Sequence, residues 1–337
     1  MSDVSVAAAD VHAMKVLIVK LSSLGDVVHS LPAAMDIQHA YPQAQIDWVV
    51  EPSFAPLVQR CTAVQRVIPC HLRHWRKTPF APQTRDAWRA FMNDLQAERY
   101  DAILDLQGLT KSAWVSWLAK RSSTGQKFAL ANRTDGSGYE APTRWVADVA
   151  IRMTPHIHAV TRGRALCAQA LQYDLPDRLR YGLGHAAQTH SDQVVLVHGT
   201  SRADKEWPLS HWIDLGQRLH QAGLRVVLPH GNSVEQERAQ TIASALPNAT
   251  VWPRYSIDEL TTHMASCRGV IGVDSGLSHI AVALDLPHVQ IYNFDTAWRT
   301  GPTGVAHQCS VVDVNIPSVD AVWQAWQVCW QHHVSAV

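Results

Sequence analysis

The sequence predicts an α/β protein with two parallel-sheet domains that face each other across a cleft. Its 337 residues are long for one domain and suit two. In both halves, short apolar runs of strand length alternate with segments whose apolar residues recur at helical spacing. Several of these runs end in a polar turn that leads into a helix. In α/β sheets, ligands bind at such turns, against the helix N-termini.

The first unit of this kind spans residues 14–35. Val16–Val19 is predicted to be a buried strand, followed by a polar turn that ends at Asp26 and then by a helix. Asp26 has two open interpretations, because its carboxylate can cap the helix or act as a general base at the edge of the cleft. Strong capping would lower its pKa and make it a weaker base. The turn has one glycine where a dinucleotide-binding loop needs three, which argues against a dinucleotide site.

The rest of the first half continues the alternation. Strands are predicted at residues 46–50, 66–69 and 101–105, and helices at residues 84–99 and 156–171. The strand at 101–105 again leads through a polar turn into a helix, so we expect its turn to open at the same edge as Asp26.

Two basic segments lie between these elements. The first, residues 71–77, contains Arg73, Arg76 and Lys77 around an aromatic residue. It is either a solvated charged loop or an anion site, since arginine binds carboxylate and phosphate bidentately. The second, residues 120–145, is basic and rich in Gly and Ser. It is predicted to be a mobile loop that either closes over an anionic acceptor or is simply exposed and variable.

The second half repeats the pattern after a segment without a clear period, residues 174–190. Placing the boundary there gives domains at residues 14–185 and 186–316. The predicted strands of the second half are residues 194–198, 225–228, 249–252, 269–273 and 288–292, the last of the series. A terminal amphipathic helix at 319–332 carries three tryptophans at helical spacing, which indicates core packing.

Polar residues follow two strand ends of the second half. Thr200, Ser201 and Lys205 come after the strand at 194–198. The hydroxyls can donate to phosphate oxygens, and Lys205 can neutralise charge on a leaving diphosphate, although a surface lysine is the simpler interpretation. Glu235 lies early in its helix, where it can accept from ribose hydroxyls or merely complement the helix N-terminus.

A third junction, Asp274-Ser275-Gly276, joins the strand at 269–273 to a helix. The N–H groups and the helix dipole there suit a diphosphate. Asp274 can cap the helix or accept a hydrogen bond from a sugar hydroxyl. The chain has no D-x-D motif. We therefore expect basic groups and helix N-termini to stabilise the diphosphate without an obligatory metal ion or cofactor.

Composition excludes several classes of protein. Lys plus Arg and Asp plus Glu both number 29, so no overall field attracts the chain to nucleic acid. The 19 histidines are scattered without metal-ligand spacing. The six cysteines show no framework, which indicates reduced thiols in a cytosolic protein. No apolar run reaches membrane-spanning length. Residues 1–13 lack a basic region, so we expect a frayed tail and no signal peptide.

The chain resembles the ADP-heptose:lipopolysaccharide heptosyltransferases, glycosyltransferase family 9, and is most similar to the heptosyltransferase I group. The similarity runs from residue 14 over nearly the whole chain, with its motifs in the family's order. It is carried by Met14–Pro32 with its Ser-Ser-Leu-Gly-Asp turn, Trp48–Glu51, Arg73–Lys77, Asp105–Leu109, Thr200–Pro208 and Val273–His279.

The resemblance implies a GT-B fold, in which two Rossmann-like domains face each other. It implies an acceptor-binding N-terminal domain, a nucleotide-sugar-binding C-terminal domain, and a final segment, residues 317–337, whose helix packs back on the N-terminal domain. The implied activity is transfer of L-glycero-D-manno-heptose from ADP-heptose to Kdo of the inner core, on Kdo-lipid A. Such a transfer inverts the anomeric centre by a single displacement.

The resemblance also assigns roles to residues of this chain. Asp26 is the implied general base and Lys205 the group that holds the diphosphate. The implied donor-binding residues are Thr200, Ser201, Lys205, Glu235, Tyr255 (beside the adenine), Asp274, Ser275, Gly276 and His279. The implied acceptor-binding residues are Ser23, Gly25, Arg73, Arg76 and Lys77.

The chain departs from the family pattern at three places. Asn293-Phe294-Asp295-Thr296 stands where Gly-Pro-Thr-Asp is usual, close to the expected donor site. His74 stands where a further arginine often occurs, which makes the expected acceptor site less basic. Ser275 replaces a common threonine and keeps the hydroxyl.

Three rival functions stay open. The first is another GT-B transferase, such as a heptosyltransferase II or an enzyme for a different sugar nucleotide. The second is a nicotinamide-dependent oxidoreductase, which the missing glycine fingerprint disfavours. The third is a non-catalytic nucleotide-sugar-binding protein. For the favoured function we expect a cytoplasmic protein in peripheral contact with the inner membrane, where a lipid acceptor lies.

Overall fold

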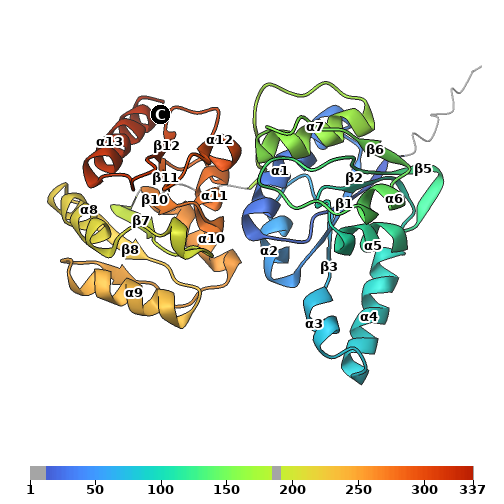
Figure 1. Ribbon diagram of the computed structural model, residues 1–337, viewed down its shortest axis with the longest axis horizontal. Coiled ribbons are helices and arrows are strands. Elements are labelled where there is room, and N and C mark those ends of the chain that lie inside the picture. The colour runs from blue at the N-terminus through green and yellow to red at the C-terminus, as the bar shows by residue number, and fades with distance from the viewer. Residues whose placement is uncertain (1–12, 184–190, 337) are drawn as a thin grey trace, which may run out of the picture.

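The computed structural model describes residues 13–183 and 191–336, which form two six-stranded parallel sheets covered by helices (Figure 1). This confirms the predicted α/β architecture with two parallel sheets. Residues 1–12 of the predicted tail, 1–13, and the predicted domain boundary at 185/186 lie outside the described residues.

The first sheet has the strand order β3-β2-β1-β4-β5-β6, and neighbouring strands pair in parallel. Its strands are β1 (Lys15–Val19), β2 (Gln45–Val50), β3 (Arg66–Pro69), β4 (Tyr100–Asp105), β5 (Arg121–Leu130) and β6 (Val149–Ile151). The helices of this half are α1 (Leu24–Ala40), α2 (Ala55–Gln59), α3 (Leu72–Lys77), α4 (Pro82–Leu95), α5 (Thr110–Leu118), α6 (Pro142–Val146) and α7 (Ala159–Leu171), with the 3-10 turn η1 (Pro52–Phe54).

The second sheet has the order β12-β11-β10-β7-β8-β9, which is the same topology when read from its other edge. Its strands are β7 (Gln193–Val197), β8 (Arg225–Leu228), β9 (Thr250–Val251), β10 (Gly269–Val273), β11 (His288–Tyr292) and β12 (Gln308–Val312). Its helices are α8 (Leu209–Gln221), α9 (Ser233–Ser244), α10 (Ile257–Ala265), α11 (Gly276–Ala283), α12 (Ala297–Thr300) and α13 (Val319–Ala336), with the 3-10 turn η2 (Ala203–Lys205).

Strand β1 is apolar from Val16 to Val19 because both faces of the sheet are covered there. On β1, Val16 and Ile18 belong to one hydrophobic cluster, whereas Leu17 and Val19 belong to another on the opposite face. All four side chains are fully buried. A strand buried on both faces has no polar alternation, which is why the run was recognisable as a parallel strand from the sequence.

The two halves meet through α1 and α11, which pack against each other. One continuous hydrophobic cluster includes buried residues of both helices and of both sheets. Glycine is required at this contact. A Cβ on Gly25 would lie 2.6 Å from a ring carbon of His279, and a Cβ on Gly276 would lie 2.6 Å from a Leu24 methyl. These glycines therefore let the first turns of the two helices approach closely.

The structure corrects two predictions in the first half. Residues 120–145 are not a single mobile loop, because β5 occupies residues 121–130 and pairs with β4 and β6. Its outer residues are polar and exposed, so the segment lacked the apolar signature of a buried strand. The basic run at 71–77 forms the short helix α3, and Trp75 from that run packs into the hydrophobic cluster beneath it.

Two further corrections concern the end of the chain. Strand β12 follows β11, so residues 288–292 are not the last strand. Helix α13 packs against β11, β12 and α8 of the second half, far from the first sheet (Figure 1). The expectation that it packs back on the N-terminal domain is therefore wrong. Its buried Trp326 belongs to the cluster of the second sheet and lies close over Gly269 of β10.

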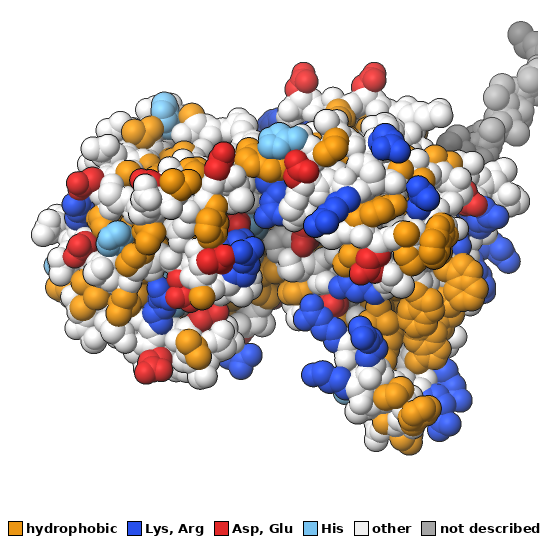
Figure 2. Space-filling view, in the orientation of Figure 1, with side chains coloured by type: hydrophobic (Ala, Val, Ile, Leu, Met, Phe, Trp, Pro, Cys, Tyr) orange, Lys and Arg blue, Asp and Glu red, His pale blue; other side chains and the backbone are white. Residues whose placement is uncertain are grey.

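One face of the first half carries an unusual number of hydrophobic side chains. Figure 2 shows them gathered over α4 and α5, with Lys and Arg beside them. Phe80 and Trp117 are 96% and 62% exposed. No helix among residues 13–183 and 191–336 has the length and apolar character that crossing a bilayer requires.

Asp105 shapes the loop after β4. Its buried carboxylate accepts hydrogen bonds from the backbone N–H groups of Gln107 and Gly108, at 2.9 and 3.1 Å, and from the Ser112 hydroxyl. The Gln107 amide oxygen in turn accepts from the backbone N–H of Leu21, at 3.0 Å. Burial raises the pKa of Asp105 to about 6, although its hydrogen bonds act in the opposite direction.

This raised pKa predicts a pH-dependent stability. Because Asp105 binds its proton more tightly in the folded chain, the free energy of unfolding should decline by roughly 3 kcal/mol as pH rises from about 4 to about 6, with roughly 2 kcal/mol of that decline above pH 4.5, and then level off. Asp105→Asn keeps an oxygen acceptor for the loop and cannot ionise, so it should remove that decline. Urea unfolding between about pH 4.5 and 7.5 measures it. Asp86→Asn, at an exposed carboxylate, is the control, and an unchanged slope in Asp105→Asn would contradict the assignment.

Candidate functional site

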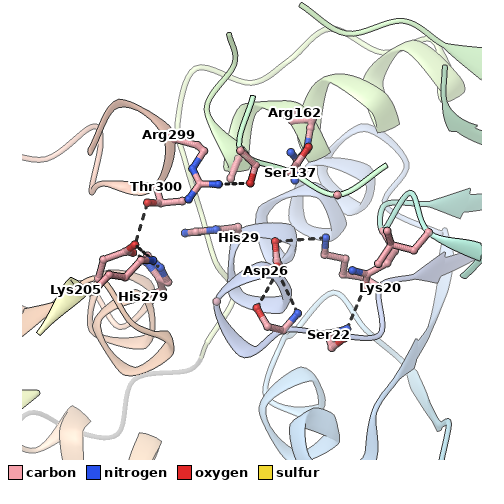
Figure 3. Close-up of a pocket in the computed structure, with 18 of the residues that line it drawn as sticks. Lys20, Ser22, Asp26, His29, Ser137, Arg162, Lys205, His279, Arg299 and Thr300 are labelled. Carbon is pink, nitrogen blue, oxygen red and sulfur yellow. Dashed lines mark hydrogen bonds and ion pairs between the residues drawn. The ribbon is translucent and has the colours of Figure 1, made fainter. Parts of the chain in front are cut away.

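A cavity of about 370 Å³ lies between the two halves (Figure 3). It opens where β1 and β4 end on one side and where β7 and β10 end on the other. In a sheet of this order these are the positions at which the strand order reverses, the usual place for a ligand. The charged and imidazole side chains that line it are Lys20, Asp26, His29, Lys111, Arg162, Lys205, Asp274, His279 and Arg299.

Asp26 lies in the first turn of α1, three residues after the N-cap Ser23. One carboxylate oxygen accepts from the backbone N–H and the hydroxyl of Ser23, at 3.1 and 2.8 Å. The other lies 3.7 Å from the Lys20 ammonium, and 40% of the side chain is exposed. Asp26 is therefore not the N-cap itself. It is the N3 residue of a capping box, whose side chain binds back to the N-cap residue Ser23. Its other oxygen still faces the cavity.

Lys20 is the buried cation behind Asp26. It directly follows β1, and its ammonium donates to the Leu106 carbonyl at 3.1 Å while its side chain is 3% exposed. Burial lowers the pKa of Lys20, and Asp26 partly offsets that effect. Burial alone would raise the pKa of Asp26. Lys20, the Ser23 hydrogen bonds and His29 together outweigh it and hold the pKa of Asp26 below its ordinary value.

Asp274 forms the corresponding centre on the second half. It directly follows β10 and is buried, with Lys205 Nζ at 2.5 Å on one oxygen and His279 Nε2 at 3.3 Å on the other. Gln290 also donates to it, at 3.3 Å. Burial opposes its ionisation, but His279 and Lys205 lower the pKa of Asp274 below the ordinary value. The predicted residues Lys205, Asp274 and His279 thus meet in one cluster, and Figure 3 shows Lys205 and His279 side by side.

The histidines connect this cluster with the first half. His29 of α1 and His279 of α11 lie with their rings 4.2 Å apart. Burial and the neighbouring His279 lower the pKa of His29 well below its usual range. His29 is thus a neutral side chain that packs α1 against α11 at the wall of the cavity.

Two of the predicted hydroxyl residues lie next to Asp274. Thr200 donates to the Asp274 backbone carbonyl at 3.2 Å, and Ser275 follows Asp274 directly, whereas Ser201 is exposed after Thr200 and does not line the cavity. Ser275 is the N-cap of α11, and its buried hydroxyl has no hydrogen-bond partner among the described residues. Gly276 begins the helix. An unpartnered hydroxyl and a helix N-terminus at one point can both donate to an anion.

The structure does not bring Glu235 and Tyr255 into this cavity. The Glu235 carboxylate accepts from the Gly231 N–H at 2.6 Å and lies close to Gly199, just past the end of β7. The Tyr255 ring stacks on His263, with centroids 4.4 Å apart. Both residues lie on the side of β8 and β9, so a ligand touching them would have to extend from the cavity along the sheet edge.

Of the basic residues predicted to bind the acceptor, one is linked to the cavity and two lie away from it. Arg73 lies 3.1 Å from the Glu51 carboxylate, which also lies 3.7 Å from the Lys111 ammonium. Lys111 lines the cavity and donates to the Ser22 hydroxyl at 2.6 Å. Arg73 is thus linked to the cavity through Glu51. Arg76 and Lys77 are exposed on α3 and do not line it.

Several cavity residues were missed from the sequence. Arg162 is buried and donates to the Thr134 hydroxyl at 2.8 Å, and Arg299 donates to the Gly136 carbonyl from the other half. With Lys20, Lys111 and Lys205, they give the cavity five cations against the two carboxylates Asp26 and Asp274. The cavity therefore suits an anionic ligand. Lys20 had a sequence signal, since it follows the first strand directly, whereas Arg162 and Arg299 lie on helices far along the chain.

Asn293, one of the departures from the family pattern, holds the loop that carries Lys205. Its buried side-chain amide donates to the carbonyls of Asp204 and Glu206, at 3.1 and 2.9 Å. Through these two hydrogen bonds, the altered motif fixes the backbone of η2 on both sides of Lys205. Among the described residues, no three His, Cys, Asp or Glu side chains gather as a metal ion would need.

Comparisons with known proteins agree with one another. Residues 88–322 match the family model described as glycosyltransferase family 9 (heptosyltransferase). The chain is 39% identical over 302 residues to the lipopolysaccharide heptosyltransferase 1 of Pseudomonas aeruginosa. This alignment covers 86% of this chain and 82% of that protein.

Two solved structures are also similar. The Escherichia coli heptosyltransferase WaaC with ADP matches with a TM-score of 0.84 and 34% identity, covering 94% of this chain and 100% of that one. The same enzyme with ADP-2-deoxy-2-fluoro heptose matches with a TM-score of 0.78 and 35% identity, covering 92% and 98%.

The contact between Lys20 and Asp26 predicts a measurable change. Lys20→Met removes the buried positive charge, so the pKa of Asp26 should rise toward that of an ordinary aspartate, by roughly one to three units. A carbon-detected NMR titration of the aspartate carboxylates measures it. Lys77→Met, at an exposed lysine of α3, is the control and should leave the Asp26 titration in place. An unshifted Asp26 in Lys20→Met would remove Lys20 from this role.

Proposed function

This chain belongs to glycosyltransferase family 9, the heptosyltransferases, and on that premise we propose that it transfers L-glycero-D-manno-heptose from ADP-heptose to Kdo of the lipopolysaccharide inner core. It is a glycosyltransferase with the GT-B arrangement of two Rossmann-like sheets. The observation that carries the proposal is the cavity itself. It joins the Asp26 carboxylate of one half to the Lys205 and Asp274 pair of the other, with an excess of three positive charges.

The proposed reaction is a single displacement at the anomeric carbon. Asp26 takes the proton of a Kdo hydroxyl, whose oxygen forms the new bond to the heptose. The bond from that carbon to the diphosphate breaks, and its electron pair stays on the departing ADP. Attack and departure on opposite faces of the sugar invert its configuration. Asp26 is ionised at neutral pH and can accept the proton, and its capping bonds hold the carboxylate in place. Its lowered pKa makes it a weaker base than an ordinary aspartate.

On the donor side, Lys205 neutralises the charge that develops on the diphosphate. Thr200, Ser201, the Ser275 hydroxyl and the N-terminus of α11 at Gly276 donate to phosphate oxygens. Asp274 and His279 contact the heptose and orient Lys205. Further along the sheet edge, Glu235 binds the ribose and Tyr255 lies beside the adenine. In this proposal no obligatory metal ion or cofactor takes part, because lysine and helix N–H groups supply the positive charge.

On the acceptor side, Ser23 and Gly25 lie at the base of the cavity beside Asp26. Lys111 and Arg162 face the cavity and suit the carboxylate of Kdo. Arg73, with Arg76 and Lys77 on the same helix, meets anionic groups of the acceptor further out. Because that acceptor is anchored in lipid, we propose a cytoplasmic protein in peripheral contact with the inner membrane.

The alternatives are a heptosyltransferase II or another sugar-nucleotide transferase, and a binding protein of the same fold. A panel of sugar-nucleotide donors, each assayed with Kdo-lipid A, separates the proposed enzyme from the other transferases. The proposed enzyme should turn over with ADP-heptose and Kdo-lipid A together. Multiple turnover with any acceptor excludes the binding protein.

Asp26→Asn tests the proposed base. It keeps an oxygen that can accept from Ser23 but cannot take up a proton, so acceptor-dependent ADP release should fall by about 10²- to 10⁴-fold. Binding of ADP, followed by calorimetry, should be retained because Asp26 lies on the acceptor side. The control is Asp86→Asn on exposed α4. Unchanged ADP release in Asp26→Asn would reduce this residue to a helix cap.

Lys205→Met tests the donor side. Loss of the ammonium should lower turnover by about 10²- to 10³-fold, because charge on the leaving diphosphate is no longer neutralised. It should also weaken ADP binding, which Asp26→Asn should not do. Lys127→Met, in β5, is the matched control. If Lys205→Met binds ADP as tightly as the wild type and turns over equally fast, the diphosphate lies elsewhere.

A further inference from the structure

The face of the first half that carries α4, α5 and α6 exposes several large aromatic side chains (Figure 2). Phe80 is 96% exposed in the turn before α4, and Trp114 and Trp117 of α5 are 38% and 62% exposed. Trp145 of α6, which packs against α5, is 73% exposed. Monomeric soluble proteins rarely expose such a group of large apolar side chains without a partner.

This aromatic surface is firmly supported from below. Trp88 of α4 stacks on Trp114, with ring centroids 5.0 Å apart and planes 17° apart. Trp75 of α3 meets Trp88 edge-on at 5.3 Å and is itself buried in the hydrophobic cluster under the sheet. The exposed rings therefore extend from packed helices, so they are presented in fixed positions.

The same elements are strongly basic. Residues 72–95, 110–121 and 142–149 contain nine Lys and Arg but three Asp and Glu, in a chain whose charges balance overall. Of the three acids, Asp86 is paired with Arg89 and Asp148 with Arg121. Lys120 follows the end of α5 and Arg144 directly precedes Trp145 in α6, and both are exposed. The surface thus combines apolar rings with a local excess of positive charge.

We propose that this aromatic and basic face, defined by Phe80, Trp114, Trp117, Trp145, Lys120 and Arg144, docks on the surface of an anionic phospholipid bilayer. Tryptophan sits at the headgroup level of membranes, and each nearby lysine or arginine is attracted by anionic lipid. Since no described helix is suited to span a bilayer, the contact is a surface contact.

The position of the face relative to the cavity adds to the inference. Helix α5 begins beside the cavity, where Lys111 lines the wall, and carries Trp114 and Trp117 further along. Docking through α5 would bring the acceptor side of the cavity to the membrane. A sugar on a lipid anchor could then reach Asp26 without leaving the bilayer. This part of the inference rests on the proposed lipid-linked acceptor.

Vesicle flotation of the full chain tests the proposal. Wild type should float with vesicles of phosphatidylethanolamine containing phosphatidylglycerol, and less with phosphatidylcholine alone. Trp117→Ser/Trp145→Ser should lower the partition coefficient on the order of tenfold or more, because aromatic rings anchor at the interface. Lys120→Gln/Arg144→Gln should lower it roughly fivefold for each charge, and high salt should do the same. Val234→Ser/Val314→Ser, at exposed valines of the second half, is the matched control and should float like wild type.

Activity with two forms of acceptor separates this inference from the proposed function. The tryptophan variant should keep wild-type ADP release with a water-soluble Kdo-bearing fragment and lose it with the acceptor embedded in vesicles. Absence of all turnover in wild type would count against the proposed function, while flotation would still decide the docking face. Three results would overturn the docking face: no flotation of wild type, equal flotation of the tryptophan variant, or self-association through this face without lipid binding.

Discussion

The close contact between the first turns of α1 and α11 is the constraint on which the rest of the structure depends. Gly25 and Gly276 permit it, because a methyl group at either position would collide with a side chain of the opposite helix. The contact continues into one apolar cluster shared by both sheets. It places two helix N-termini, and the strand ends before them, at a single cavity. The two predicted binding glycines thus have a packing role that is independent of any ligand.

The charges in the cavity follow from this arrangement. Two carboxylates, Asp26 and Asp274, each form an ion pair with a lysine. Lys20 with Ser23, and His279 with Lys205, hold them ionised against the cost of burial. The two pairs differ in exposure. Lys20 is sealed behind Asp26, whereas Lys205 comes from a short 3-10 turn and is 18% exposed. A buried lysine can only change the pKa of its carboxylate partner. An accessible lysine can leave its carboxylate and bind an incoming anion. This difference matches a base on one side and a leaving-group site on the other.

The sequence predicted the fold well where both faces of a strand are buried, as in β1, β4, β7 and β10. It failed where a strand is polar on its outer side, as in β5, or lies at a sheet edge, as in β12. Asp26, Lys205 and Asp274 could be found because they lie in the polar turns and first helical turns that follow the central strands β1, β7 and β10. Arg162 and Arg299 could not, because their approach to the cavity depends on how helices far apart in the sequence pack. The packing partner of α13 could not be predicted either. Its three tryptophans indicate that the helix is partly buried, but they do not indicate which sheet it packs against.

Both sheets have the same topology, because the second sheet reads β9-β8-β7-β10-β11-β12 where the first reads β3-β2-β1-β4-β5-β6. Each sheet contributes the carboxyl ends of its two central strands to the same cavity. The molecule therefore has an approximate internal symmetry in which each half contributes its own set of loops to the cavity. The loops of the first sheet can change while those of the second are kept, provided that the glycine contact between α1 and α11 is retained. If the two substrates bind to different halves, as proposed, the two specificities are free to evolve separately on one scaffold.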